Sequence, residues 1–148
     1  MTFLIESNAF KNNGFIPIIH TIYGTNISPL IEWKDAPCDT KCFVLIMEDC
    51  NSWCYWIIYN IPNHINKLRE GIKTLPTPAI FGINSWEEQN YCGPCIPKGI
   101  QKYFFKLFAL NTQIKKKDKV NSFNIERLIK PYIIDETVLV GLYEEKII

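Results

Sequence analysis

A loop and the strand that follows it decide the fold of this chain: Tyr91-Cys92-Gly93-Pro94-Cys95-Ile96-Pro97-Lys98-Gly99-Ile100-Gln101-Lys102-Tyr103, and then Phe104-Phe105-Lys106-Leu107-Phe108-Ala109-Leu110. The first part is so rich in glycine, proline and cysteine that neither a helix nor a regular strand is expected to run through it. The second part is apolar, aromatic and of strand length. A turn-rich loop that leads into a buried strand is a common way to hold a pocket on a rigid scaffold.

Apolar segments on both sides of this stretch predict further strands. Residues 42–47 are apolar without alternation, which is typical of a strand buried on both faces. Residues 53–61 predict a second rich strand, and residues 3–10 and 15–22 predict two strands separated by a turn. The chain therefore has a mainly β character from its first residues onward.

Helical signals are confined to the C-terminal part. Ser122 is a candidate N-cap for a short helix with apolar residues at helical spacing, and Pro131 either ends that helix or begins a second one. A last strand is expected from Thr137 to Tyr143. Many short strands with brief late helices indicate a mostly antiparallel β fold.

Composition places the chain among globular proteins and limits its partners. The 148 residues are 47% hydrophobic and 21% charged, with a net charge of +1, and residues 1–148 are expected to form a single domain. Sixteen basic and fifteen acidic side chains nearly cancel, so we expect no nucleic-acid partner and no attraction to an anionic membrane. The basic run at residues 115–119 is interpreted as a solvated loop.

The N-terminal residues predict a cytoplasmic location. They lack a basic region and a long apolar run, so no signal peptide is expected. No segment approaches the ~18 apolar residues of a membrane span. In the cytosol, the six cysteines are expected to be free thiols, redox groups or metal ligands rather than a disulfide framework.

The cysteine spacing raises two chemical alternatives. Cys92-Gly93-Pro94-Cys95 spells the active-site tetrapeptide of thioredoxins, whose first thiol needs a helix N-terminus to become a thiolate. Here Pro97 follows too soon for a helix to begin at Cys92. Zinc is a second alternative, but Cys42 and Cys54 lie in apolar runs where cysteine packs as a small hydrophobe.

A series of ordered motifs resembles one known family. The residues that carry the resemblance are Ile16-Pro17, Gly24-Thr25-Asn26-Ile27-Ser28-Pro29 with Trp33, Trp56-Ile57-Ile58-Tyr59-Asn60-Ile61-Pro62, the loop Tyr91 to Gly99 with Tyr103 and Phe105, and Leu139-Val140-Gly141 with Tyr143. They are similar to those of bacterial-type members of the phosphatidylethanolamine-binding protein family, which includes the Raf kinase inhibitor proteins. The similarity extends over nearly the whole chain.

The resemblance implies a fold and a site. The fold would be an antiparallel β-sandwich with short C-terminal helices. The site would be a small pocket for a small anionic or polar ligand, lined in the family by an aspartate, two histidines, a tyrosine and a glycine–proline loop. The resemblance further implies a possible homodimer and a possible protein partner such as a kinase.

Several residues of this chain depart from that pocket. Asp49, Gly93, Pro94 and Tyr103 match the family, whereas Asn51 replaces a second aspartate, and the two histidines fall on Tyr55 and Gln101. Neither tyrosine nor glutamine becomes cationic near neutral pH. We therefore expect a non-enzymatic ligand-binding or interaction protein without cofactor or metal, in which the pocket persists but its affinity for anions is reduced.

A different reading of the same pocket rests on its cysteines. By the resemblance, Cys50, Cys54, Cys92 and Cys95 all lie on segments that border it. The alternative is therefore a thiol-based redox or metal-sensitive protein that uses Cys92 and Cys95.

Overall fold

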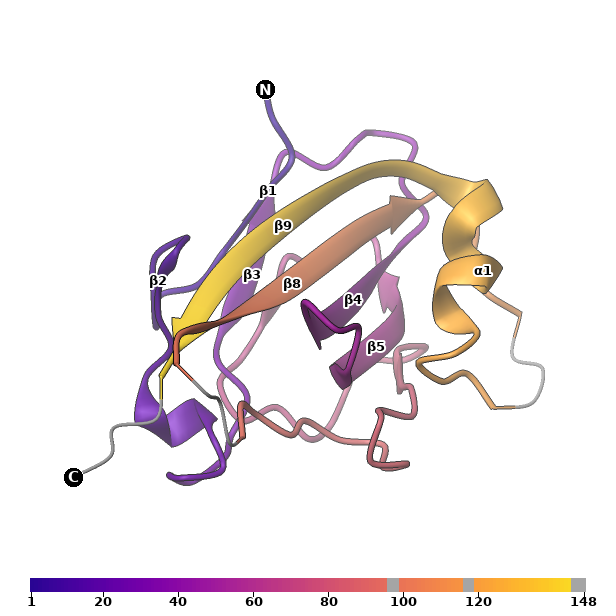
Figure 1. The fold of residues 1–148 in the computed structure, drawn as a ribbon. Coiled ribbons are helices and arrows are strands. Elements are labelled where there is room, and N and C mark those ends of the chain that lie inside the picture. The colour runs from indigo at the N-terminus through magenta and orange to yellow at the C-terminus, as the bar shows by residue number, and fades with distance from the viewer. Residues whose placement is uncertain (96–98, 116–118, 145–148) are drawn as a thin grey trace.

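The computed structural model describes residues 1–95, 99–115 and 119–144, and these form two packed β-sheets with the short helix α1 (Ile125–Ile129) at one end (Figure 1). The larger sheet has the order β2 (Gly14–Phe15), β9 (Ile133–Tyr143), β8 (Gln101–Leu110), β4 (Cys42–Asp49), β5 (Cys54–Pro62), β7 (Ile80–Phe81). The smaller sheet has the order β1 (Leu4–Glu6), β3 (Ile31–Lys34), β6 (Lys67–Leu68). All neighbours are antiparallel except β2 and β9, which are parallel, so the predicted antiparallel sandwich is confirmed.

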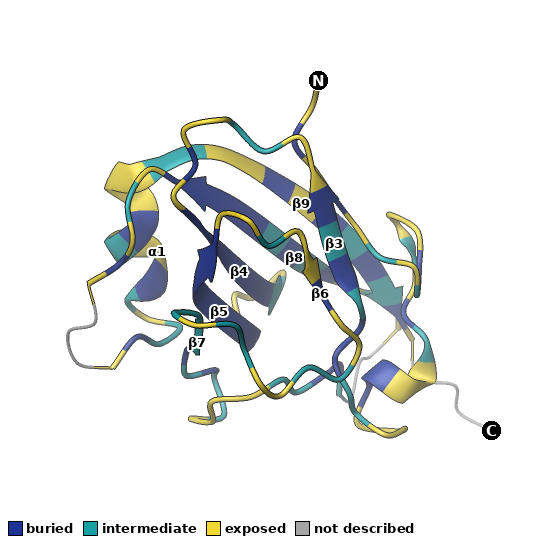
Figure 2. Cartoon of the chain, turned by 180° about the vertical axis from the view of Figure 1, so that it is seen from behind, coloured by how far each residue is buried: buried dark blue, intermediate teal, exposed yellow. Residues whose placement is uncertain are grey.

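The central strands of the larger sheet are buried on both faces, as Figure 2 shows for β4 and β5. Along β4, Phe43, Leu45 and Met47 point into the core between the sheets. Val44 and Ile46 point into a second core on the opposite face. This two-sided burial explains why residues 42–47 are apolar without alternation, and it confirms that prediction.

The N-terminal strands are shorter than the sequence predicts. Only β1 and β2 form within residues 3–22, and a 3₁₀ helix, η1 (Ile18–His20), replaces the second half of the expected strand 15–22. Pro17 precedes η1, and Gly24 lies so close to it that a Cβ would be 2.3 Å from the carbonyl oxygen of Ile18. Here the chain folds back on itself, which an extended strand does not allow.

Helix α1 packs on the outer face of the larger sheet. Ile125 and Ile129 of α1 (Ile125–Ile129) are buried in the second core, and η2 (Lys130–Tyr132) follows directly. Pro131 lies in the first turn of η2, as the sequence allows. The expected cap at Ser122 is wrong, because Asn124 is the N-cap and no side chain bonds to the helix there. No helix in the described ranges is long and apolar enough to cross a bilayer.

Strand β5 contains two irregularities that shape the site and its surroundings. Its pairing with β4 shifts between Phe43 and Leu45 and again between Met47 and Glu48. At the second shift, Met47 pairs with Trp56 and Glu48 with Cys54, so Tyr55 is the extra residue of a β-bulge. At the first shift, Asn60 has a positive φ of 55°.

We expect Asn60→Ala to destabilise the protein by at least about 2 kcal/mol. The buried Asn60 amide donates to the Ile114 carbonyl at 2.9 Å and accepts from the Ile114 N–H at 2.8 Å. Alanine leaves both backbone groups unpaired, at ~1–3 kcal/mol for each buried group. Urea unfolding measures the loss. Asn63→Ala is the control, since Asn63 is exposed and donates one hydrogen bond to Thr40; equal losses would contradict the role of Asn60.

Candidate functional site

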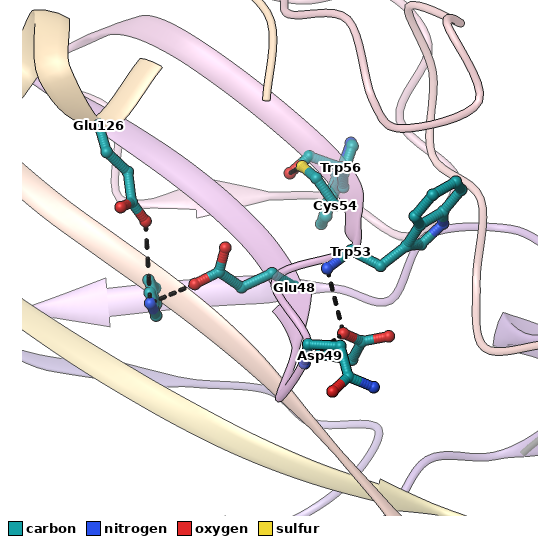
Figure 3. Close-up of polar contacts among 8 residues, drawn as sticks. Glu48, Asp49, Trp53, Cys54, Trp56 and Glu126 are labelled. Atoms are coloured by element: carbon teal, nitrogen blue, oxygen red, sulfur yellow. Dashed lines mark hydrogen bonds and ion pairs between the residues drawn. The ribbon is translucent and has the colours of Figure 1, made fainter. Parts of the chain in front are cut away.

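The site is centred on the Asp49 carboxylate, at the turn between β4 and β5. One oxygen, Oδ1, accepts hydrogen bonds from the backbone N–H groups of Asn51 at 2.8 Å and Trp53 at 3.1 Å. The other, Oδ2, accepts from the Tyr55 hydroxyl at 2.8 Å. Figure 3 shows Asp49 at this turn, with its bond to the backbone of Trp53. The carboxylate is therefore held by two backbone donors of its own turn and by the Tyr55 hydroxyl of β5.

The β-bulge brings Tyr55 to this carboxylate. In a regular strand, neighbouring side chains alternate between faces. Here both Tyr55 and Trp56 belong to the core between the sheets, while Cys54 belongs to the opposite core. The bulge thus turns the Tyr55 ring to the face of the sheet on which Tyr103 of β8 lies.

Aromatic rings surround Tyr55 in nearly perpendicular contacts. Its ring centroid is 5.3 Å from that of Tyr103, at an interplanar angle of 82°, and 5.3 Å from that of Trp86, at 69°. Trp86 in turn contacts Trp53 at 5.4 Å and 87°. Edge-to-face pairs of this kind are favourable beyond the area that they bury. Tyr55 and Tyr103 are buried, whereas Trp53 remains 43% exposed.

The two phenols of the site retain their protons. Burial raises the pKa of Tyr55, and the hydrogen bond to Asp49 raises it further. Burial also raises the pKa of Tyr103, as do the charges of Cys95 and Asp49, while a hydrogen bond with Tyr55 acts in the opposite direction. Both phenols are thus neutral at physiological pH.

The glycine–proline loop is held by the N-terminal segment. The Gly93 N–H donates to Asn26 Oδ1 at 2.8 Å, the Cys92 N–H donates to the Tyr55 carbonyl at 3.1 Å, and the Ile22 N–H donates to the Pro94 carbonyl at 3.2 Å. Gly93 and Pro94 are buried. A Cβ on Gly93 would lie 1.9 Å from the His20 carbonyl oxygen, so only glycine permits this close approach.

Gln101 and Asn51 flank the central residues of the site along the chain. Gln101 lies on β8 two residues from Tyr103, on the same side of the strand, while Lys102 between them is exposed. Asn51 has an exposed side chain and contributes its backbone N–H to Asp49. Of the predicted site residues, Asp49, Tyr55 and Tyr103 lie together. Gly93 and Pro94 belong to the adjoining loop. Lys98 lies outside the described residues.

The four candidate cysteines do not form one cluster. Cys50 is exposed at the turn, and Cys54 is buried on the opposite face of the sheet, where burial raises its pKa to about 12. Cys92 and Cys95 are partly buried on the loop, and burial raises the pKa of both thiols. No helix begins at Cys92 within the described residues 91–95. These features disfavour the thiolate that disulfide exchange requires.

Metal-ligand groups are also separated. In residues 1–95, 99–115 and 119–144, no three or more His, Cys, Asp or Glu side chains lie close enough together to hold an ion. Next to Asp49 on β4, Glu48 points the other way, toward Glu126 of α1, and both carboxylates pair with Lys106 (Figure 3). This ion-pair cluster belongs to the outer face of the sheet and not to the site.

Sequence reasoning missed three residues of this arrangement. Trp53 and Trp86 extend the aromatic group around Tyr55, and Asn26 holds the loop through Gly93 and, at 3.8 Å, through the Cys92 sulfur. Asn26 lies in a motif that carries the family resemblance, which was its only signal. The two tryptophans follow from no spacing, since they come from separate loops.

The fold and the site define a class: a β-sandwich with a polar site at the ends of its central strands. A sequence profile described as phosphatidylethanolamine-binding protein matches residues 6–144. The chain belongs to the phosphatidylethanolamine-binding protein family.

Relatives and solved structures agree with this assignment. UPF0098 proteins of Methanothermobacter thermautotrophicus and Aquifex aeolicus are 32% and 35% identical, over 94% and 95% of this chain and 97% and 87% of theirs. The structure of a putative phosphatidylethanolamine-binding protein homolog from Chlamydia trachomatis has a TM-score of 0.90 at 29% identity, covering 98% of this chain and 99% of that one. E. coli YbcL, described as a new member of the mammalian family, has a TM-score of 0.91 at 26% identity, covering 99% and 100%.

We expect Gly93→Ala to displace the loop from the N-terminal segment. The added methyl group collides with the His20 carbonyl, so one of the two segments must shift, at ~1–3 kcal/mol. Amide resonances of Ile22, Asn26 and Cys92 should move in a ¹H–¹⁵N spectrum. Gly99→Ala is the control for backbone strain without a collision: its φ of 67° disfavours a side chain, but no atom lies within 4 Å of its Cβ position, so the Asn26 and Cys92 resonances should stay in place. Unchanged resonances at Asn26 and Cys92 would refute the close packing.

We expect Cys92 and Cys95 to react with iodoacetamide more slowly at pH 8 than the exposed Cys38 and Cys50. Because the pKa of each loop thiol is raised, its thiolate fraction is small and its rate should keep increasing above pH 9. Mass spectrometry of digests measures the rates. Insulin reduction, compared with Cys92→Ser, should show no Cys92-dependent turnover, and such turnover would establish the redox alternative instead.

Proposed function

We propose that this protein is a non-enzymatic binding protein of its family whose site takes a small polar ligand without the ionic attraction to anions expected of related pockets. The observation that supports this most directly is the direction of one hydrogen bond. The Tyr55 hydroxyl has a single proton, and it donates that proton to Asp49. The hydroxyl therefore has no further proton to donate to an anionic ligand.

Other donors near the site are also occupied. The Gly93 N–H is bonded to Asn26 and the Cys92 N–H to the Tyr55 carbonyl. An anion needs donors, preferably charged ones, to replace its hydration. The described ion pairs do not involve Asp49, so no Lys, Arg or His nitrogen lies within 4.0 Å of its carboxylate in that part of the chain.

The energetic consequence follows from the two replaced histidines. A hydrogen bond to a charged group contributes about 1.5–3 kcal/mol, against roughly 1 kcal/mol for a neutral pair. Two imidazolium donors are thus worth one or more powers of ten in anion affinity, since 1.4 kcal/mol is a factor of ten. The Asp49 charge, uncompensated by a described cation, adds repulsion to this loss.

The absence of an enzymatic role is part of the proposal. Thiols and phenols around Asp49 have raised pKa values, so none of them is an activated nucleophile. His20 is buried, and its Nδ1 atom lies 2.8 Å from the Ile27 carbonyl oxygen. We therefore do not assign it the role of a general base. Association with a protein partner such as a kinase, and pairing into a homodimer, stay predictions.

We expect the double variant Tyr55→His/Gln101→His to bind phosphate and phosphoethanolamine at least about tenfold more tightly than the native protein. A histidine beside Asp49 is favoured in its cationic form. The gained affinity should therefore be largest at pH 6 and decline as the pH rises through the imidazole pKa. NMR titration of amide resonances gives the dissociation constants.

Tyr55→Phe is the matched control for this titration. It removes the hydroxyl that binds Asp49 but adds no cation, so it should not gain phosphate affinity. Strong binding of phosphate by the native protein, equal to that of the double variant, would show that affinity never depended on imidazoles and would refute the proposal.

A further inference from the structure

A second cavity lies apart from the Asp49 site. Its volume is about 450 Å³, which is in the usual range of small-molecule sites. Three segments form it: residues 25–28 before β3, residues 71–73 after β6, and residues 89–91 after β7, with Phe81 of β7 beside them. Its lining does not include Asp49, Tyr55 or Tyr103. A ligand bound there would therefore be separate from a ligand at Asp49.

Hydrogen bonds between the segments hold the walls of this cavity in place. The Gly71 N–H donates to the Ser28 carbonyl at 2.9 Å, which joins the first two segments. The Tyr91 hydroxyl donates to the His20 carbonyl at 2.7 Å, which joins the third segment to the N-terminal part of the chain. The walls are thus ordered before a ligand arrives, and ordering them costs little on binding.

Two amide side chains of the cavity are each anchored by one hydrogen bond. Gln89 Nε2 donates to the Phe81 carbonyl at 3.1 Å, and Asn90 Nδ2 donates to a Glu88 carboxylate oxygen at 2.9 Å. Each amide retains a second N–H and a carbonyl oxygen that form no side-chain hydrogen bond with a described residue. A ligand can therefore use both a donor and an acceptor on each of these side chains.

Ser28 adds a hydroxyl group in an unfavourable environment. The residue is 2% exposed, and its Oγ atom forms no hydrogen bond with any described residue. Burying a hydroxyl group without a partner is costly, so such a group in a folded protein calls for an explanation. Since Ser28 lines the cavity, a ligand hydroxyl placed against it would provide a partner.

The polar groups of the cavity favour a neutral ligand. Lys73 is the one charged side chain among the described residues that line it, and it is exposed. A single exposed ammonium group contributes little to the binding of an anion. Neutral hydrogen-bonding side chains are more numerous in the lining: Thr25, Asn26, Ser28, Gln89 and Asn90. Most polar contacts open to a ligand therefore involve neutral donors and acceptors.

We propose that this cavity binds a neutral polyhydroxylated molecule of the chemical class of a monosaccharide. A sugar hydroxyl both donates and accepts hydrogen bonds, as do the amide and hydroxyl side chains of the lining. The C–H groups of a sugar ring are apolar and match Ile27, Ile72 and Phe81, which line the same cavity. This site goes beyond the proposed function, and it does not depend on what binds at Asp49.

Methyl β-glucoside and tetrahydropyran-2-methanol form the decisive pair of probes. Both have a six-membered oxygen ring with a hydroxymethyl group, but only the glucoside carries hydroxyl groups on the ring. We expect the glucoside to bind at least about fivefold more tightly in an NMR titration, with shifts of the Ile27, Gly71 and Asn90 amide resonances. Equal or tighter binding of the tetrahydropyran would overturn the inference. So would unchanged resonances with the methyl glycosides of glucose, galactose and mannose.

Two variants test whether the sugar binds in this cavity. Gln89→Ala removes one anchored amide and should weaken the glucoside about three- to tenfold. Ser28→Ala removes a hydroxyl that has no partner among the described residues, so the fold loses no described hydrogen bond of that group, and glucoside binding should weaken about threefold or more. Gln113→Ala is the control: it makes the same change as Gln89→Ala on the exposed loop after β8 and should leave the titration unchanged.

The outcomes separate this inference from the proposed function. Glucoside affinity that is unchanged in both Gln89→Ala and Ser28→Ala would show that the sugar binds elsewhere and would overturn the inference. Acetate or phosphate that shifts the same amide resonances and binds more tightly than the glucoside would overturn it as well. Neither result changes the phosphate titration of Tyr55→His/Gln101→His, which tests the site at Asp49.

Discussion

The hydrogen bond from the Tyr55 hydroxyl to the Asp49 carboxylate determines the chemistry of the site. It depends on the β-bulge in β5, since in a regular strand Tyr55 and its neighbour Trp56 would lie on opposite faces, whereas here both belong to the core between the sheets. The bond uses the proton of the phenol and leaves the carboxylate charged. The family resemblance implies a histidine at this position, and under the proposed function Tyr55 supplies a neutral phenol there instead of a potential cation.

The scaffold that permits this is a sheet buried on both faces. Its β4 and β5 strands lie between two hydrophobic cores, so their ends are rigid supports for polar groups. Around them, the site assembles segments that are far apart in sequence. The loop at Gly93 is fastened to Asn26 and passes within contact of the His20 backbone. Rigid positioning of this kind costs little on binding, because the groups are already ordered.

Burial also separates residues that look alike in the sequence. Glu48 and Asp49 are neighbours, yet one pairs with Lys106 on the outer face and the other receives Tyr55 on the inner face. Cys54 and Cys50 are four residues apart, but one is buried and the other is exposed. The Cys92-Gly93-Pro94-Cys95 tetrapeptide lacks a helix to stabilise a thiolate, and burial favours the protonated thiols. The same short motif therefore has a different chemistry in this environment.

By itself, the sequence determined the mainly β fold, the doubly buried strand at residues 42–47 and the glycine–proline loop, because apolar patterning and turn residues are local properties. The family followed from the resemblance of its ordered motifs. The resemblance also predicted Asp49, Tyr55 and Tyr103 as residues of one pocket, and the structure brings these three side chains together. The sequence overestimated the N-terminal strands and missed Trp53, Trp86 and Asn26. Only the tertiary structure decided which way Tyr55 points, which partner receives its proton and which cysteines lie apart. Those features depend on strand register and on contacts between distant segments, and a one-residue bulge changes them without altering the local pattern.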